Sequence, residues 1–496
     1  MGKVLVEKLL RTCPGIKKMY LLVRPKKDVK QKERIKSIID GPLFELLRTN
    51  YPETISKIHI ICGDCEQINL GLSDKDAELL RKTVTVVFHV AASVRFDDTL
   101  KKAVLMNARG TRDVISLAKE MKNLKVLVHI STSYCNTDKK VIDEIVYPPQ
   151  ADWRKIIKMA ESMDDELLHI IQPKILDHFP NTYTFTKSLA ENIVYEKCDQ
   201  IPTVIFRPSI VISSYSDPIP GWVDNMNGPV GLILGVGLGI IRTMYCDEDV
   251  VADWVPVDVA ISAVITSAWY QGCANELKKK ECLVINACTS NTKPVSYKSV
   301  TTNSLKLTKI YPFNRVMWYP FVNMTTNNIC YQLQVFLFHI LPGLFLDALL
   351  KLKGEKLSLM RIYRKAYFAN MALVYFMTNE WHFKNGQFMS LSKVMKEEDQ
   401  ETFQLDLSDR DPMVALKEAL FGTKKFLLKE SPHFERTLPK AKSKLRKLFI
   451  LHCTLFTGVI VFVLFLFWSN HSFLHKQIIK FLKYKLILEM ELIHQS

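Results

Sequence analysis

The stretch VLVHISTSY, residues 126–134, joins a short apolar run to four consecutive hydroxyl-bearing side chains. Short runs rich in valine, isoleucine and leucine predict a buried strand, because such side chains pack well on a pleated surface. Residues 126–130 therefore predict a strand, and Ser131, Thr132, Ser133 and Tyr134 follow at its carboxyl end. Open α/β sheets bind their ligands at this end of their strands.

Outward from this stretch, similar apolar runs recur at Met19–Val23, Ile58–Cys62 and Val84–Val90, after a helical start at Val4–Leu10. Segments of helical length separate the runs, which predicts a parallel sheet with helices on both faces. The expected fold class is α/β, with a doubly wound parallel sheet of the type that binds dinucleotides.

A second motif, Tyr183-Thr-Phe-Thr-Lys187, opens a segment that is helical in character. Four residues make about one helical turn, so the phenol and the ammonium share one face. A nearby cation lowers the pKa of a phenol and allows proton transfer to a substrate oxygen. A hydroxyl from Ser131, Thr132 or Ser133 would then bond the carbonyl oxygen on which charge develops, and the pattern does not choose among the three.

Arg24 directly follows the run Met19–Val23, at the end of a predicted strand. In dinucleotide-binding folds an acidic residue near this position binds the ribose of NAD, whereas an arginine accommodates the extra phosphate of NADP. A solvated run of surface charge is the alternative interpretation. We expect NADPH as the cofactor.

The composition limits the classes of molecule that we expect the protein to bind. The chain has 496 residues, 48% of them apolar, and a formal net charge of +16, which favours an anionic partner. The eleven cysteines lack the spacing of a disulfide framework, and the pair Cys62 and Cys65 has no second pair or histidine cluster to complete a zinc site. No metal is expected. Nucleic acid is not expected either, because the basic stretch near the C-terminus lacks interleaved aromatic residues.

A membrane span is predicted at Leu448–Trp468, where the sequence carries no charged residue and is long enough to cross the hydrocarbon core as a helix. Basic residues are denser before this span than after it, which predicts that the large N-terminal part faces the cytosol. They are Arg436, Lys440, Lys442, Lys444, Arg446 and Lys447 before it, and Lys476, Lys480, Lys483 and Lys485 after it.

Another apolar stretch lies at Val335–Leu350, but His339, Pro342 and Asp347 interrupt it. These residues argue against an ordinary spanning helix. The expectation is a helix that lies against the membrane, or the wall of a lipid channel.

The sequence resembles the alcohol-forming fatty acyl-CoA reductases, which belong to the extended short-chain dehydrogenase/reductase superfamily with a Rossmann-type sheet. Over residues 2–260 the resemblance rests on VVFHVAASVRF (86–96), NARGT (107–111), Gly63-Asp64, Tyr183–Lys187, Arg207-Pro208-Ser209 and DWVPVD (253–258). The segments Leu359–Phe383 and 426–430 resemble the C-terminal domain of that family, so the resemblance covers nearly the whole chain. Leu359–Phe383 also argues against the main rival, a membrane-bound sterol-type dehydrogenase.

The resemblance implies an activity and further site residues. The implied reaction is the NADPH-dependent reduction of a long-chain fatty acyl-CoA to a primary alcohol. Tyr183 would deliver the proton, and Lys187 would tune the phenol and hold the ribose. The implied cofactor-binding residues are Gly2, Arg24, Asp64, Ala91, Ala92, Asn107, Tyr183, Lys187, Pro208 and Ser209.

The start of the chain departs from the family pattern. The family opens with a strand and a loop of the type T-G-x-T-G-F-x-G-K, whereas this sequence begins Met1-Gly2-Lys3, so only the last glycine corresponds. Those glycines let backbone N–H groups approach the pyrophosphate, and the strand is central in the sheet. The expectation is either a fragment of a longer reductase or a poor cofactor binder, such as an inactive scaffold.

The predicted organisation is a reductase domain followed by a mostly helical domain and a C-terminal anchor at the endoplasmic reticulum or the peroxisome. The boundaries are 1–270 for the reductase domain, 271–325 for a connecting region, 326–432 for the helical domain, 433–447 for a basic juxtamembrane segment, 448–468 for the span and 469–496 for a tail.

Overall fold

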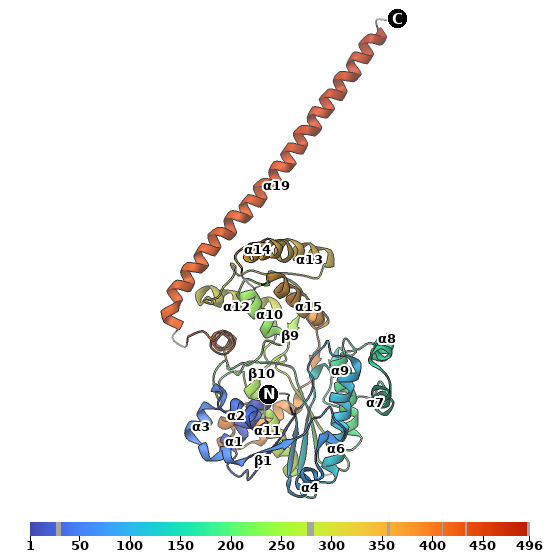
Figure 1. The fold of residues 1–496 in the computed structure, drawn as a ribbon, viewed down its shortest axis with the longest axis vertical. Coiled ribbons are helices and arrows are strands. Elements are labelled where there is room, and N and C mark those ends of the chain that lie inside the picture. The colour runs from blue at the N-terminus through green and yellow to red at the C-terminus, as the bar shows by residue number, and fades with distance from the viewer. Residues whose placement is uncertain (26–30, 275–281, 355–357, 409, 432–433, 494–496) are drawn as a thin grey trace.

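A computed structural model describes residues 1–25, 31–274, 282–354, 358–408, 410–431 and 434–493; for residues 467–493 it describes only the helical backbone. The last three residues of the predicted tail lie outside these ranges. The α/β part forms one end of the body, a helical part forms the other, and the long helix α19 (Phe434–Ile493) extends away from the helical end (Figure 1).

The predicted strands are present, and all pair in parallel. The main sheet has the order β11-β6-β4-β3, formed by β3 (Val86–His89), β4 (Val126–Ile130), β6 (Thr203–Pro208) and β11 (Leu283–Ala287). A separate pair joins β1 (Met19–Val23) to β2 (Ile58–Cys62). The Rossmann-type fold class predicted from the apolar runs is confirmed.

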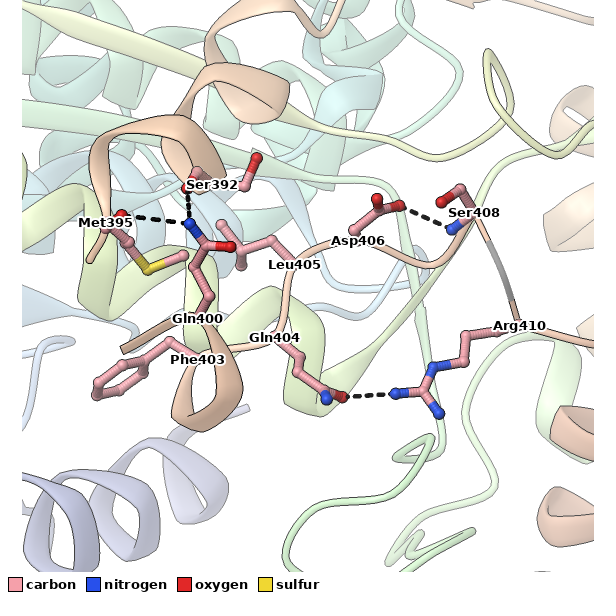
Figure 2. Close-up of a pocket in the computed structure, with 9 residues that line it drawn as sticks. All are labelled: Ser392, Met395, Gln400, Phe403, Gln404, Leu405, Asp406, Ser408 and Arg410. Atoms are coloured by element: carbon pink, nitrogen blue, oxygen red, sulfur yellow. Dashed lines mark hydrogen bonds between the residues drawn. The ribbon is translucent and has the colours of Figure 1, made fainter. Parts of the chain in front are cut away.

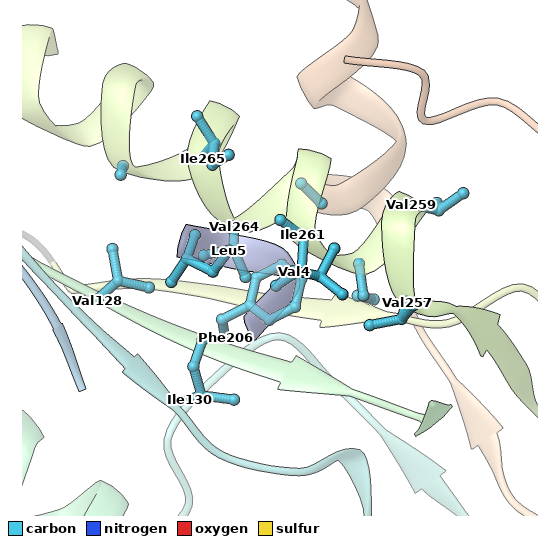
Figure 3. Packing of buried hydrophobic residues seen from close by; sticks show 14 of the residues in the cluster. Val4, Leu5, Val128, Ile130, Phe206, Val257, Val259, Ile261, Val264 and Ile265 are labelled. Atoms are coloured by element: carbon cyan, nitrogen blue, oxygen red, sulfur yellow. The ribbon is translucent and has the colours of Figure 1, made fainter. Parts of the chain in front are cut away.

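Helices cover both faces of the main sheet. On one face, α1 (Gly2–Thr12) and α11 (Val257–Ala274) pack on β4 and β6, where Val4 and Leu5 meet Val128 and Phe206 (Figure 3). On the other face lie α6 (Gly110–Lys119) and α9 (Thr182–Tyr195). All residues of β4 and β6 are buried, as expected for central strands whose apolar side chains point both ways.

Both β1 and β3 are sheet edges, because no strand among the described residues bonds to their free sides. Leu22 on β1 and Val86 on β3 are accordingly 39% and 40% exposed. Met19 and Ile58 still pack against the core under α1, so the strand pair and the main sheet share one hydrophobic core.

The helical part returns to the α/β part before the chain ends. After α15 (Leu359–Met377), strand β14 (His382–Phe383) pairs with β5 (Val141–Ile142). Helix α16 (Gly386–Val394) then contributes to the core under the main sheet, where Phe388 and Leu391 are buried. The helical part is therefore tied to the sheet by a strand pair and by a shared core.

The remaining elements complete the two parts. The helices are α2 (Gln31–Ile39), α3 (Glu45–Asn50), α4 (Asp74–Thr83), α5 (Leu100–Ala103), α7 (Trp153–Ser162), α8 (Asp165–Leu176), α10 (Pro229–Gly237), α12 (Tyr297–Ile310), α13 (Asn328–Val335), α14 (Leu341–Leu352), α17 (Glu397–Thr402) and α18 (Pro412–Gly422). The short strands are β7 (Ile210–Ile212), β8 (Thr243–Tyr245), β9 (Val251–Ala252), β10 (Trp254–Pro256), β12 (Val295–Ser296) and β13 (Asn323–Thr325).

Two helical stretches of the described chain are long and apolar enough to cross a membrane, Asn328–Leu352 and Phe434–Leu466. The second stretch includes residues 448–466 of the span that the sequence predicts at 448–468. In that stretch the large apolar side chains from Phe449 to Leu466 are 42–62% exposed.

Candidate active site

The three candidate hydroxyls follow β4 directly but have different surroundings. Thr132 caps the short helix η5 (Ser133–Asn136) by accepting a bond from Tyr134 N, and it is also hydrogen-bonded to the phenol of Tyr183. Ser133 donates to the carbonyl of Arg207 at 2.9 Å and contacts Cys288 Sγ at 3.0 Å. Ser131 is buried, with its N–H bonded to Phe206 O. Of the three, Thr132 is the one that the structure joins to Tyr183.

Tyr183 and Lys187 lie in the first turns of α9, which begins after Asn181. The Asn181 side chain accepts a hydrogen bond from Thr184 N and so caps the helix. Lys187 Nζ donates to Ile130 O at 2.7 Å, at the carboxyl end of β4. The predicted phenol, ammonium and hydroxyl thus meet at one end of one strand.

Burial dominates the electrostatics of this group. It raises the pKa of Tyr183 well above its ordinary value, while the hydrogen bond from Thr132 acts in the opposite direction. Burial also lowers the pKa of Lys187 to about 8, against the opposing effect of the Glu191 carboxylate. The expectation that Lys187 lowers the pKa of the phenol is wrong for this structure, because the ammonium is bonded to Ile130 O and desolvation outweighs the other effects.

Asn107 connects the loop after β3 to α9. It lies in a π-helical turn, η4 (Val104–Arg109), and its amide exchanges two hydrogen bonds with the backbone of Ser93. Its Nδ2 also donates to Thr186 Oγ1 at 3.0 Å. Because Thr186 precedes Lys187, Asn107 fixes the position of the lysine relative to that loop.

A buried ion pair that we did not predict holds the site together. Arg207 on β6 and Glu191 on α9 are 0% and 2% exposed, and Nε and Nη2 of the arginine bond the two carboxylate oxygens at 2.8 and 2.7 Å. Cys135 Sγ, in η5, also bonds Glu191 Oε1. The sequence signal was an acidic residue one turn after Lys187 and an arginine inside an otherwise apolar strand.

Four predicted cofactor-binding residues surround the same end of the sheet. Ala91 is exposed and Ala92 half-buried in the loop after β3, and Pro208 ends β6. Ser209 is buried, and its hydroxyl has no hydrogen-bond partner in the described structure. A buried hydroxyl in this state fits a polar ligand, so these residues suit the nicotinamide half of a dinucleotide.

The other three predicted cofactor residues lie apart, on the side of β1 and β2. Arg24 is exposed just after β1, and Asp64 follows β2 with Oδ1 bonded to Glu66 N. Gly2 is exposed in the first turn of α1. Among the described residues, no glycine-rich turn joins Gly2, Arg24 and Asp64 to the residues at the carboxyl end of the main sheet.

An apolar chamber opens beside this end of the sheet. The space inside it is about 210 Å³, its mouth is open, and its walls come from β7, β10, α10, α12 and α18. Thr289, in its lining, follows Cys288, the residue in contact with Ser133. The lining thus comes within one residue of the contact between Cys288 and Ser133 but includes none of the candidate catalytic side chains, and Lys293 and Arg410 add two cationic side chains to it.

Two glycines allow α18 to form one wall of the chamber. A Cβ on Gly422 would lie 1.7 Å from Gly221 O, and a Cβ on Gly221 would lie 2.0 Å from Glu418 O. Gly221 also has a φ of +68°, which other residues adopt only with strain. These glycines set how closely the helix approaches the turn at residue 221.

A second cavity, of about 320 Å³, lies in the segment from Ser392 to Arg410 and shares Arg410 with the chamber (Figure 2). Its polar groups are engaged within the segment: Gln400 donates to Ser392 O and Met395 O, and Arg410 donates to Gln404 Oε1. It contains none of the predicted site residues. Among the described residues, no group of three histidine, cysteine or acidic side chains could hold a metal ion.

Known proteins resemble this chain in sequence and in fold. Residues 1–264 match the NAD_binding_4 family model and residues 338–430 match the Sterile family model, both described as Male sterility protein. Two solved reductase domains share the fold at 16% identity. That of a nonribosomal peptide synthetase from Mycobacterium tuberculosis has a TM-score of 0.56 and covers 86% of this chain and 89% of its own. The terminal R domain from the myxalamid pathway has a TM-score of 0.54, with coverages of 85% and 87%.

The sequence relatives are more similar. Fatty acyl-CoA reductase 1 of Xenopus laevis is 38% identical over 448 residues, which is 90% of this chain and 86% of the relative. Fatty acyl-CoA reductase wat of Drosophila melanogaster is 34% identical, with coverages of 95% and 90%. Human fatty acyl-CoA reductase 2 is also 34% identical, with coverages of 91% and 87%.

The fold, the NAD-binding family model and the reductases among the relatives define a reductase with a nicotinamide cofactor. The comparisons identify the family within this class. The chain belongs to the fatty acyl-CoA reductases, as its sequence predicted.

The buried ion pair yields a prediction about stability. Glu191→Ala leaves the buried Arg207 guanidinium without its carboxylate, so we expect the free energy of unfolding to fall by about 3–5 kcal/mol. The matched control is Glu196→Ala near the end of the same helix, which removes an exposed pair with Arg154 and should change stability little. Denaturant unfolding in detergent micelles measures both, and equal effects of the two variants would contradict the assignment.

Proposed function

We propose that this protein reduces long-chain fatty acyl-CoA thioesters to primary alcohols with NADPH. The observation that carries the proposal is the group of Thr132, Tyr183 and Lys187 at the carboxyl end of β4, and the apolar chamber, whose lining comes within one residue of the Ser133–Cys288 contact, supports it. A group that handles one oxygen suits carbonyl reduction, and a mainly apolar chamber suits a long acyl chain. The names of the relatives agree with this substrate.

The roles follow from the contacts of each side chain. Two molecules of NADPH, bound in turn, would each supply one hydride: the first reduction releases CoA as its thiol and leaves the aldehyde, and the second reduces the aldehyde to the alcohol. Tyr183 delivers a proton to the substrate oxygen, and Thr132, whose single O–H bonds the phenol in this structure, turns that donor to the same substrate oxygen when substrate is bound. Ser133 is assigned a structural role, because its hydroxyl is bonded to Arg207 O. Lys187 holds the cofactor ribose and supplies positive charge beneath the site.

The choice of NADPH rests on Arg24. Its exposed guanidinium, just after β1, is suited to the phosphate that distinguishes NADP from NAD, since arginine bonds phosphate with paired N–H groups. On the nicotinamide side we assign Ala91, Ala92, Asn107, Pro208 and Ser209. Asp64 is assigned to the adenine side, and Gly2 to the pyrophosphate at the start of α1.

We assign the acyl chain to the chamber and the CoA phosphates to its cationic lining. Lys293 bonds Arg410 O, and the Arg410 guanidinium stacks over Tyr215, so both cations belong to an ordered rim. Their positive charge attracts phosphate groups, although the Asp411 carboxylate also lies in the lining, and Leu234, Leu307 and Leu416 are among the apolar side chains that would contact the acyl chain.

The membrane assignment follows from α19. We propose one span at 448–468, with the reductase domain on the cytosolic side because basic residues precede the span. The proposed compartment is the endoplasmic reticulum or the peroxisome. The proposed domains have the boundaries that the sequence predicts. The anchor would keep the chamber near acyl substrates that are poorly soluble in water.

The proposed role of Tyr183 predicts the effect of removing its hydroxyl. Tyr183→Phe removes the proton donor, so we expect kcat for hexadecanol formation from palmitoyl-CoA and NADPH to fall about 10²–10⁴-fold. Product is measured by mass spectrometry on microsomes that contain the full chain. The control is Tyr195→Phe, which removes a half-exposed hydroxyl at the end of the same helix and should leave turnover unchanged. Undiminished turnover in Tyr183→Phe would refute the proposed role.

The second prediction is a pH profile. Burial lowers the pKa of Lys187 to about 8, so the ammonium loses its proton at a lower pH than an exposed lysine would. If the charged form is required, kcat/KM for NADPH is full below this pH and falls as the pH rises through it. In Lys187→Arg the side chain stays charged, and the fall should disappear from the residual activity. A wild-type profile that does not fall there would argue against a charged Lys187.

The third prediction tests the chamber. Ala419 on α18 lines it, so Ala419→Phe should shorten the accepted chain and lower kcat/KM for octadecanoyl-CoA relative to dodecanoyl-CoA by about tenfold or more. Val414→Phe, at an exposed position of the same helix outside the lining, is the control. An unchanged preference in Ala419→Phe would exclude the chamber as the acyl-chain site.

A further inference from the structure

Helices α13 and α14 present a continuous apolar surface that the described body does not cover. The π-helical turn η6 (Phe336–Ile340) joins them into one helical stretch from Asn328 to Leu352. Along it, six large apolar side chains are 50–65% exposed; we call them the apolar ridge: Leu333, Phe336, Leu337, Leu341, Leu344 and Phe345. Exposed apolar side chains this close together mark a contact surface rather than ordinary surface composition.

The opposite face of this stretch is fixed to the body. Tyr331, Val335, His339 and Gly343 are buried at intervals of four residues, which places them on one side of the helix. His339 Nε2 accepts a hydrogen bond from Arg242 N at 3.0 Å, and a Cβ on Gly343 would lie 2.9 Å from Met360 Sδ.

A helix attached along its length in this way cannot leave the body to cross a bilayer. The stretch Asn328–Leu352 passes a length and hydropathy test for a span, but only its exposed half is available to lipid. Its C-terminal end is also fixed, because the Asp347 carboxylate accepts hydrogen bonds from Leu359 N and Met360 N at the start of α15.

Aromatic contacts place the ridge beside the start of the apolar part of α19. Phe321 packs edge-on against Phe338 of η6 and also contacts His452 of α19, with ring centroids 5.7 and 5.0 Å apart. Tyr319 contacts Phe449 at 4.9 Å. Tyrosine and tryptophan concentrate where a membrane meets water, and Trp318 Nε1 is bonded to His452 as well.

The shape of the molecule agrees with these contacts. In Figure 1, α13 and α14 run across the end of the body from which α19 extends. A bilayer crossed by α19 therefore meets this end of the body first. Basic side chains border the ridge at Lys351, Lys353, Arg361, Arg364 and Lys365, and all five are exposed.

We infer that the apolar ridge lies in the surface of the same bilayer that α19 crosses, as a second membrane contact that enters one leaflet without spanning it. The lipid chains cover the six apolar side chains, and anionic headgroups meet the basic border. The exposure and the attachment of these helices do not depend on the substrate. We therefore expect this membrane contact whatever substrate the reductase takes.

Photo-crosslinking of the full chain in nanodiscs of phosphatidylcholine and phosphatidylserine tests the inference. The photoreactive residue p-benzoylphenylalanine replaces Leu337 or Phe345 in the ridge, Val459 in the span as the positive control, and Ile170 on α8 as the negative control. Ile170 is 68% exposed, so it matches the ridge in exposure but belongs to the α/β part. Adducts are identified by mass spectrometry.

We expect phospholipid adducts at Leu337 and Phe345 in yields close to that at Val459, and none at Ile170. Lipid adducts at Val459 alone would overturn the inference, because the ridge would then face water. Cross-links from the ridge to a second copy of the chain would overturn it in favour of a dimer interface. Neither result depends on catalysis, so the test is separate from that of the proposed function.

Discussion

The bidentate pair between Glu191 and Arg207 is the interaction on which the site depends most. One carboxylate links α9, which carries Tyr183 and Lys187, to β6 and, through Cys135, to the turn that follows Thr132. Charges buried this completely are tolerated only when paired and hydrogen-bonded, and Arg207 also donates to the carbonyls of residues 143 and 145. The pair therefore fixes the phenol, the ammonium and the hydroxyl in one arrangement.

The helical part completes the site because it is packed into the α/β part and is not a mobile appendage. Glu144 illustrates this, since its carboxylate accepts bonds from Asn286 N on β11 and from Gln387 N at the start of α16. Near Tyr183, Phe96 stacks on the phenol ring and packs against Phe376 of α15. The apolar chamber likewise has walls from both parts, with β7 and β10 on one side and α10, α12 and α18 on the other.

A reductase for acyl-CoA must accept a charged, water-soluble group and a long apolar chain together. The chamber combines an apolar interior with the cations Lys293 and Arg410, and the ridge and α19 bring the helical end of the body to the membrane. The sheet lies at the end of the body opposite to α13 and α14 (Figure 1). In the two proposals the same helical domain serves substrate binding and membrane contact.

The sequence by itself determined the strands, the class of fold and the family, because apolar periodicity and the spacing from Tyr183 to Lys187 are local properties of the chain. It also identified the hydroxyl cluster after β4 and the apolar C-terminal helix. Only the tertiary structure decided that Thr132 meets the phenol while Ser133 faces Arg207. It also decided that burial raises the pKa of Tyr183, and that one face of Asn328–Leu352 is attached while the other is exposed. Those features depend on contacts between residues distant in the chain, and on how much water each group loses, which no local pattern encodes.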